Sequence, residues 1–266
     1  MTGTIRVEQV DGVATVTISH AARFNAMSRS MWRELRAVFE QLQVSTEVRC
    51  IVVRGEGAHF CAGGDISEYT SFRFEEASLR DFHENDVWGA LNAMLSCDVP
   101  MVARIEGNCM GAGVEIASCC DIRLASADAR FGAPIAKLGF PMAPREAALV
   151  AREVGRMTAR QMLLEAAIFN APEMQARGFV SRVLEGAGLA ADVQATVHRI
   201  AGLAPQAARA NKQTLRALNN PLNDVDYLEK SLNLEPIQIN SPYAYASSLE
   251  HREGIQAFIN KRKPCF

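Results

Sequence analysis

The sequence has few of the features that would place the protein in a membrane, on nucleic acid or outside the cell. No apolar run reaches the roughly 18 residues that a membrane span requires. The first residues, Met1–Val7, lack a basic region followed by a hydrophobic segment, so we expect no secretory signal. The formal net charge of −2 at pH 7 gives no broad basic field for nucleic acid or an anionic membrane.

Cysteine and histidine are too scattered to indicate a disulfide framework or a metal site. The seven cysteines are an odd number and include no Cys-x-x-Cys pair, which fits reduced thiols better than disulfides. The five histidines lie far apart, without the spacing of metal ligands. We therefore predict a cytoplasmic protein that binds no metal.

What the sequence does contain is an ordinary globular composition, with 266 residues of which 48% are hydrophobic and 22% are charged. Two β-rich runs flank Asp11-Gly12, which predicts a hairpin with a type I′ turn. Ser28 is expected to cap a helix that reaches about Leu42. The apolar run Cys50–Val53 predicts a strand buried on both faces. Strand, glycine loop and helix continue to alternate, so we predict an α/β fold with helices packed on a largely parallel sheet.

The C-terminal part of the chain is predicted to be helical. Before it, a long helical stretch is expected to end near Leu95, and Pro100 starts the next strand. From about Val193 the spacing is helical, and no convincing strand follows. We predict a core over residues 1–192 and a helical region over residues 193–266, with breaks at Pro205 and Pro221.

Two glycine-rich loops, each between a strand and a helix, are the candidates for a functional site. One contains Ala62-Gly-Gly-Asp65, and the other contains Gly111-Ala-Gly113 shortly before Glu115. Glycine permits close approach of a ligand to the backbone, and a helix start leaves backbone N–H groups unpaired. Two such amides directed at one oxygen stabilise an oxyanion by about 3–4 kcal/mol per donor. For either loop alone, a tight connection without chemistry is the alternative.

At these loops the chain resembles the enoyl-CoA hydratase/isomerase (crotonase) superfamily. Further matching segments follow in family order and cover nearly the whole chain. The segments are Phe24-Asn-Ala-Met27, Phe60-Cys-Ala-Gly-Gly-Asp-Ile66, Pro100-Met-Val-Ala-Arg-Ile-Glu-Gly107, Gly111-Ala-Gly-Val-Glu115, Cys120-Asp-Ile-Arg123, Phe131-Gly-Ala-Pro134, Lys137-Leu-Gly139 and Arg252-Glu-Gly-Ile-Gln-Ala-Phe-Ile-Asn-Lys-Arg-Lys263.

The resemblance implies a spiral of ββα units with a C-terminal α-helical region that takes part in oligomerisation, as a homotrimer or as a homohexamer built from two trimers. It also implies an acyl-CoA thioester substrate, with no cofactor beyond the coenzyme A moiety. The amides of Ala62 and Ala112 match the oxyanion hole that stabilises an enolate. Arg23 and Lys261 could instead be ordinary solvated cations. The positions that match substrate or coenzyme A contacts are Arg23, Ala26, Ala62, Gly63, Gly64, Asp65, Ile66, Gly111, Ala112, Pro134, Ile135, Gly139, Phe258 and Lys261.

The chain departs from the family in its second carboxylate. Glu115 matches the first of two glutamates with which the family's hydratases act on one water. The second belongs in a Phe-Gly-x-Pro-Glu stretch, where this chain has Ile135. Another usual place, beyond the Leu-Gly pair, is occupied by Ala143. Both places therefore lack a proton-transferring group.

Three alternatives could make up for the missing second carboxylate. Glu146 follows closely and could act as the second catalytic group, or could only complement a helix dipole. His83, Glu84 and Asp86 lie on the preceding helical stretch, where a solvated face is the alternative. Glu115 could also work alone, or could serve only as a structural hydrogen-bond acceptor. In an apolar acyl pocket, desolvation should raise the pKa of Glu115.

Hydration of a 2-enoyl-CoA, with Glu115 activating water, is the leading hypothesis. A double-bond shift from 3-enoyl-CoA to 2-enoyl-CoA, or decarboxylation of a malonyl-type CoA, is the alternative that needs only one carboxylate. A non-catalytic acyl-CoA-binding homologue is a third possibility. Serine-type hydrolysis is disfavoured, because no Ser replaces the residues of the Gly111 turn and no His is placed to activate one.

Overall fold

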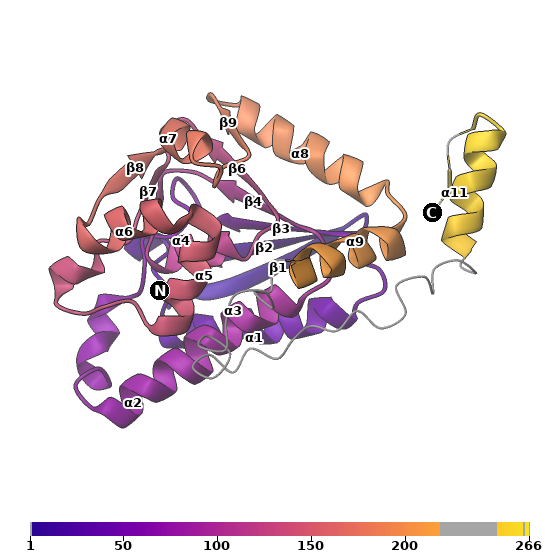
Figure 1. Ribbon diagram of the computed structural model, residues 1–266. Coiled ribbons are helices and arrows are strands. Elements are labelled where there is room, and N and C mark those ends of the chain that lie inside the picture. Colours follow the sequence, from indigo (N-terminus) through magenta and orange to yellow (C-terminus); the bar gives the residue numbers. More distant parts are fainter. Residues whose placement is uncertain (1, 219–248, 263, 266) are drawn as a thin grey trace.

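The computed structural model describes residues 2–218, 249–262, 264 and 265, which form a crotonase-like α/β fold with two mixed sheets and C-terminal helices (Figure 1). The larger sheet has the strand order β1-β2-β3-β4-β6-β9. Only β1 is antiparallel to its neighbour, so the prediction of a largely parallel sheet is confirmed. These strands are β1 (Thr4–Val10), β2 (Val13–Ser19), β3 (Cys50–Gly55), β4 (Met101–Ile105), β6 (Ile122–Ser126) and β9 (Arg182–Leu184).

The smaller sheet lies next to the glycine loops. It pairs β5 (Asn108–Met110) in parallel with β7 (Arg130–Gly132), and β7 antiparallel with β8 (Ile168–Asn170). These strands were not predicted, because three residues are too few to show an alternating pattern. β5 occupies part of the stretch that was expected to be loop.

Both faces of the larger sheet are buried under helices. Ile51 and Val53 of β3 point into the main core, whereas Cys50 and Val52 pack in a second cluster. That second cluster includes the apolar face of α8 (Gly188–Ala201). Figure 1 shows α8 over one face of the sheet, with α1 (Arg29–Val44) and α3 (Trp88–Ser96) below the other. The strand predicted to be buried on both sides is therefore confirmed.

The predicted hairpin and first helix are also confirmed. Asp11 and Gly12 have φ angles of 49° and 77°, as a type I′ turn requires. Ser28 caps α1, because its side-chain oxygen accepts a hydrogen bond from the Met31 amide at 3.3 Å. The helix continues to Val44, two residues past the predicted end.

The long helical stretch toward Leu95 is not one regular helix. It consists of a 3₁₀ helix, η2 (Ile66–Ser71), followed by α2 (Glu76–Asp81), the π-helical turn η3 (Phe82–Val87) and α3. Asp65 caps η2 by accepting from the Ser67 amide at 3.1 Å. The wider π turn changes the direction of the side chains on it, and such turns are frequent at functional sites.

The remaining helices connect and cover these sheets, and α9 begins at Pro205, as predicted. Helix α8 begins at Gly188 and continues past residue 193. The predicted division into a core over residues 1–192 and a helical region over residues 193–266 stays a prediction. Pro221 and most of the predicted helical stretch before residue 249 lie outside the described residues. No helix in the described ranges is long and apolar enough to cross a membrane. The other helices are η1 (Ala21–Arg23), α4 (Ala112–Ser118), η4 (Ile135–Leu138), α5 (Pro144–Val154), α6 (Arg156–Leu164), α7 (Ala171–Ala176), α9 (Pro205–Leu218) and α11 (Leu249–Ile259).

The close approach of α4 to the first glycine loop leads to a first prediction. A Cβ atom on Gly113 would lie 2.7 Å from the Cys61 carbonyl oxygen, so we expect Gly113→Ala to lower the free energy of unfolding by about 1–3 kcal/mol. Urea denaturation measures this change. Gly188→Ala is the control, because a Cβ there meets no atom within 4 Å. Equal unfolding midpoints for the two variants would contradict the tight contact.

Candidate active site

A cavity of about 450 Å³ lies where the two glycine loops meet the wall formed by η2, η3 and the segment from residue 134 to residue 146. It brings together residues that are far apart in the sequence. The sequence-predicted site residues that line it are Ala62, Gly63, Gly64, Ile66, His83, Gly111, Ala112, Glu115, Pro134, Ile135 and Glu146.

Strand-like pairing on both sides fixes the first loop. Cys61 forms a parallel bridge with the smaller sheet, and its carbonyl oxygen accepts from the Met110 amide at 2.9 Å. On the other side, Met27 donates to the Gly63 oxygen and accepts from the Asp65 amide, both at 2.8 Å. The loop is therefore part of the sheet framework and holds its amides in fixed directions.

The structure corrects the predicted amide donor of this loop. The Ala62 N–H donates to the Phe24 oxygen at 3.0 Å, so it is already occupied. Gly64 lies between the two residues that bond to Met27, and its own N–H therefore points away from that strand. Within the described part of the chain, the Gly64 N–H has no hydrogen-bond partner, and Gly64 lines the cavity.

The second loop supplies a comparable donor at a helix start. Ala112 is the first residue of α4, and its N–H has no partner among the residues that the structure describes. Gly111 precedes it with φ 47° and ψ −108°, a backbone conformation that favours glycine. A Cβ on Gly111 would lie 3.7 Å from the Gly63 Cα, so the two loops are in direct contact.

Glu115 projects from α4 into the cavity and is only 6% exposed. Burial, and then the nearby charge of Glu146, raise the pKa of Glu115 well above 4.5, as expected for a carboxyl group in an apolar pocket. The carboxyl group makes no hydrogen bond to any residue that the structure describes. The Glu115 carboxyl group therefore faces the cavity without a bonded partner among these residues, and its role stays a prediction.

Glu146 lies in the first turn of α5, where it was expected, but its side chain is buried and lines the same cavity. Its Oε1 atom contacts His83 Nδ1 at 2.8 Å. His83 Nε2 in turn contacts Arg73 Nη1 at 3.4 Å. Because arginine has only donors, Nε2 must accept, which leaves the proton on Nδ1 and directs it at Glu146. In this chain of contacts, Glu146 accepts from His83, and His83 accepts from Arg73.

The other candidate carboxylates lie outside the cavity lining. Glu84 pairs with Arg145 at 3.2 Å, on the surface. Asp86 is buried, so the alternative of a solvated helix face is wrong for it, and it pairs with Arg29 and Arg33. Ile135 lines the cavity with hydrocarbon only.

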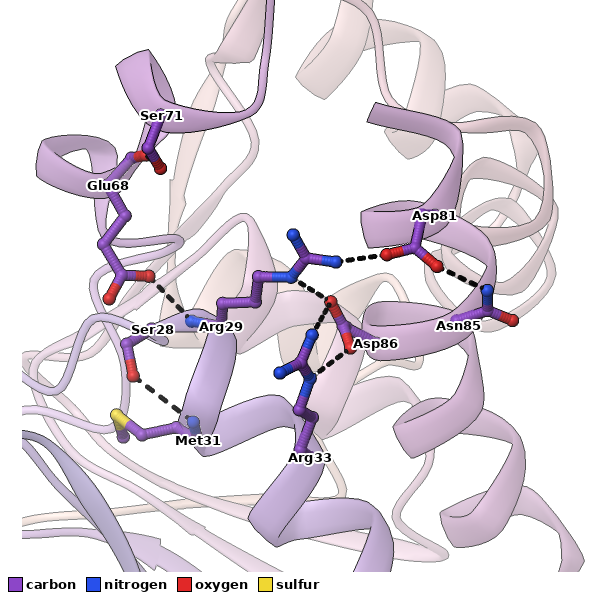
Figure 2. Close-up of polar contacts among 9 residues, drawn as sticks. All are labelled: Ser28, Arg29, Met31, Arg33, Glu68, Ser71, Asp81, Asn85 and Asp86. Carbon is purple, nitrogen blue, oxygen red and sulfur yellow. Dashed lines mark hydrogen bonds and ion pairs between the residues drawn. The ribbon is translucent and has the colours of Figure 1, made fainter. Parts of the chain in front are cut away.

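An ionic cluster fixes the wall that presents His83 (Figure 2). Arg29, at the start of α1, extends its guanidinium between Asp81 and Asp86, and Arg33 Nε reaches Asp86 at 2.7 Å. The Arg29 amide donates to the Glu68 carboxylate at 2.8 Å, so η2 is attached to the same helix terminus. The cluster therefore holds η2 and η3 at a fixed distance from α1.

The remaining sequence-predicted contacts lie outside the cavity lining. Asp65 is buried and caps η2, and Gly139 ends η4 with φ 83°. Arg23 is exposed at the end of η1, and Ala26 is buried beside it. Lys261 is exposed beyond α11. The Phe258 side chain lies outside the described residues.

Tyr69, Arg73 and Phe140 are among the lining residues that were not predicted individually. The Arg73 guanidinium carbon lies 4.5 Å from the ring centre of Tyr69 and 3.7 Å from that of Phe140. Burial is the largest of the effects that raise the pKa of Tyr69 to about 12. The sequence gives little indication that these residues line a cavity, because they come from a 3₁₀ helix and loops without a periodic pattern.

The two contacting glycine loops, with a carboxyl group beside them, on this α/β framework define a crotonase-like protein. A family model described as enoyl-CoA hydratase/isomerase matches residues 8–266. The chain therefore belongs to the enoyl-CoA hydratase/isomerase (crotonase) superfamily, as the resemblance indicated.

Relatives cover almost the full chain. It is 30% identical over 264 residues to the "Probable enoyl-CoA hydratase echA8" of Mycobacterium bovis, covering 99% of this chain and 97% of the relative. It is 30% identical over 259 residues to the short-chain-enoyl-CoA hydratase of Clostridium acetobutylicum, covering 97% and 95%. A crystal structure described as an enoyl-CoA hydratase/carnithine racemase from Magnetospirillum magneticum has a TM-score of 0.89 and 33% identity, covering 100% and 96%.

The raised pKa of Glu115 predicts a pH-dependent stability. The folded protein keeps this proton at pH values where the unfolded chain has lost it, so the folded state binds more protons and stability falls as pH rises above about 4.5. Glu115→Gln cannot ionise. The stability of this variant relative to wild type should therefore increase with pH, measured by urea denaturation between about pH 4 and 8. A difference that does not change with pH would contradict the raised pKa.

The ionic cluster predicts a loss of stability when Asp86 is neutralised. Asp86→Asn leaves Arg29 and Arg33 without their shared buried partner, so we expect the free energy of unfolding to fall by about 1–3 kcal/mol. The control is Glu40→Gln, which breaks an exposed pair with Arg36 and should cost less than about 0.5 kcal/mol. Chemical denaturation measures both variants. An equally small effect of Asp86→Asn would mean that the cluster does not hold the wall.

Proposed function

We propose that the protein hydrates a 2-enoyl-CoA thioester, using Glu115 and Glu146 as a pair. The observation that supports this most is that both side chains are buried in one cavity, although Glu146 stands at neither of the two places where the family's second carboxylate is expected. The curated relatives named as enoyl-CoA hydratases support the same reaction.

The two carboxyl groups have different surroundings and can therefore take different roles. Burial raises the pKa of Glu115, which favours its protonated form, whereas Glu146 accepts a hydrogen bond from the His83 Nδ1–H group. This reverses the role expected for Glu115 from the sequence. Glu146 is the base that activates water, and Glu115 is the acid.

The thioester oxygen is placed between the Gly64 and Ala112 amides. Glu146 takes a proton from water as the water oxygen bonds to the β carbon and the double-bond electrons move toward the thioester. The resulting enolate oxygen is stabilised by the two amides, each contributing about 3–4 kcal/mol in comparable oxyanion holes. Glu115 then gives its proton to the α carbon, and a proton passes from Glu146 to Glu115 to restore the starting state.

The remaining expectations for this reaction are proposals of the same kind. The substrate's coenzyme A moiety is the only nucleotide group required, and no metal or further cofactor takes part. The contacts of Arg23, Phe258 and Lys261 with coenzyme A, the assembly as a homotrimer or homohexamer and the cytoplasmic location stay predictions.

If a carboxylate pair hydrates the substrate, neutralising either glutamate should lower kcat to a similar extent. Crotonyl-CoA should lose its conjugated-thioester absorbance in the presence of wild type, and Glu115→Gln and Glu146→Gln should each lower kcat by at least about 100-fold, the usual contribution of general acid–base catalysis. Glu84→Gln is the matched control, because this neighbouring carboxylate is paired on the surface, outside the cavity lining. Its kcat should stay within about twofold of wild type.

Other outcomes separate the alternatives. If Glu146→Gln retains the wild-type rate while Glu115→Gln does not, one carboxylate suffices, and 3-enoyl-CoA becomes the substrate to test for a double-bond shift. Release of CO₂ from a malonyl-type CoA would identify a decarboxylase. Binding of acyl-CoAs without turnover of any of them would identify a non-catalytic homologue and refute the proposal.

A further inference from the structure

Arg73 is a cation in the wall of the cavity. It follows η2, and its backbone amide donates to the backbone carbonyl oxygen of Tyr69 at 2.8 Å. The guanidinium lies against the rings of Tyr69 and Phe140, and one of its nitrogen atoms donates to His83. Arg73 is thereby held in one orientation by two aromatic rings and one imidazole.

No carboxylate in the described ranges lies within ion-pair distance of Arg73. The nearby arginines of the same wall are different, because Arg29 pairs with Asp81 and Asp86, and Arg80 pairs with Glu76 at 2.9 Å. Burial lowers the pKa of Arg73 below its usual 12.5, so the group is partly removed from water. A guanidinium has five N–H donors, and only one of them is used by His83.

The charge of Glu146 acts to raise the pKa of Arg73, but Glu146 is bonded to His83 and lies outside ion-pair distance of the guanidinium. Much of the rest of the cavity lining is apolar. Trp32, Phe82, Val87 and Met142 line the cavity together with the rings that contact Arg73. A neutral acyl chain that fills this space would displace water from the guanidinium and leave its remaining donors without partners, which is costly in an apolar site. A carboxylate matches the planar donor pattern of arginine and would compensate the charge.

We propose that Arg73 binds a carboxylate at the far end of the acyl group, so that the preferred substrate is the coenzyme A thioester of an unsaturated dicarboxylic acid. This rests on the proposed function in one respect, since it takes the cavity as the acyl pocket. Tyr69, whose ring lies against the guanidinium, presents its hydroxyl group toward Gly64, so Arg73 and the loop amides belong to one continuous surface. The thioester end and the carboxylate end of one acyl chain can therefore be bound at the same time.

Saturated acyl-CoAs test this proposal by binding alone, because they cannot be hydrated. We would titrate the protein by calorimetry with three pairs matched in carbon number: succinyl-CoA and butyryl-CoA, glutaryl-CoA and valeryl-CoA, adipyl-CoA and hexanoyl-CoA. In at least one pair, the dicarboxylic thioester should bind about ten- to a hundredfold more tightly than its neutral partner, as expected for hydrogen bonds between charged groups. Neutral thioesters that bind as well or better in all three pairs overturn the proposal.

Variants identify the group that causes the preference. Arg73→Met should abolish it, and Arg73→Lys should retain part of it, because lysine keeps the charge but not the planar fork. Arg80→Met is the matched control, since it removes a surface arginine of the same wall that does not line the cavity. Free coenzyme A should bind wild type and Arg73→Met equally. If Arg73→Met weakens free coenzyme A and every thioester by the same factor, Arg73 binds a phosphate, and the proposal is wrong.

The two proposals fail separately. Hydration of crotonyl-CoA with no preference for dicarboxylic thioesters retains the proposed reaction and refutes the role of Arg73. A clear preference without hydration of any 2-enoyl-CoA does the reverse. If Arg73→Met does not fold, the three matched pairs measured on wild type still decide the question.

Discussion

The constraint on which the site depends is that two carboxyl groups share one largely apolar cavity. Glu115 and Glu146 come from the starts of different helices, and both are almost fully buried. Two carboxylates in such surroundings repel each other and are poorly solvated, so a proton is retained on one of them. The two groups are not equivalent, because His83 Nδ1 contacts Glu146 at 2.8 Å, whereas burial and then the charge of Glu146 raise the pKa of Glu115 well above 4.5.

The fold is compatible with the position of Glu146, the proposed second carboxylate. Moving the acid from the Ile135 position to Glu146 places it on a helix, α5, whose first turn favours a negative charge. It also places the side chain opposite η3, where the π turn brings His83 within 2.8 Å. A regular helix would not present His83 and Asp86 in the same directions, so the irregular turn, its ionic anchoring to α1 and the new carboxylate position form one arrangement.

Much of the fold could be predicted from the sequence, because its signals are local. The Asp11-Gly12 turn, the Ser28 cap and the apolar run at Cys50 each have a mechanism that acts within a few residues. The functional site could be predicted only in part. Two glycine loops and Glu115 are visible as motifs, but the choice between Ala62 and Gly64 depends on which amide Phe24 occupies, a contact across 38 residues. Likewise, the contact between His83 and Glu146 spans 63 residues.

Two parts of the site are held in place by different interactions. The loop amides are fixed by backbone pairing with Met27 and with the smaller sheet, which any sequence of suitable small residues could maintain. Tyr69, Arg73 and His83 instead stand on short irregular elements that side-chain ion pairs attach to the start of α1. Substitutions in this second part can change the cavity wall without disturbing the two loop amides proposed to bind the thioester oxygen. In the proposed reaction, the part fixed by backbone pairing therefore determines the class of chemistry, and the part attached by side chains determines which acyl group undergoes it.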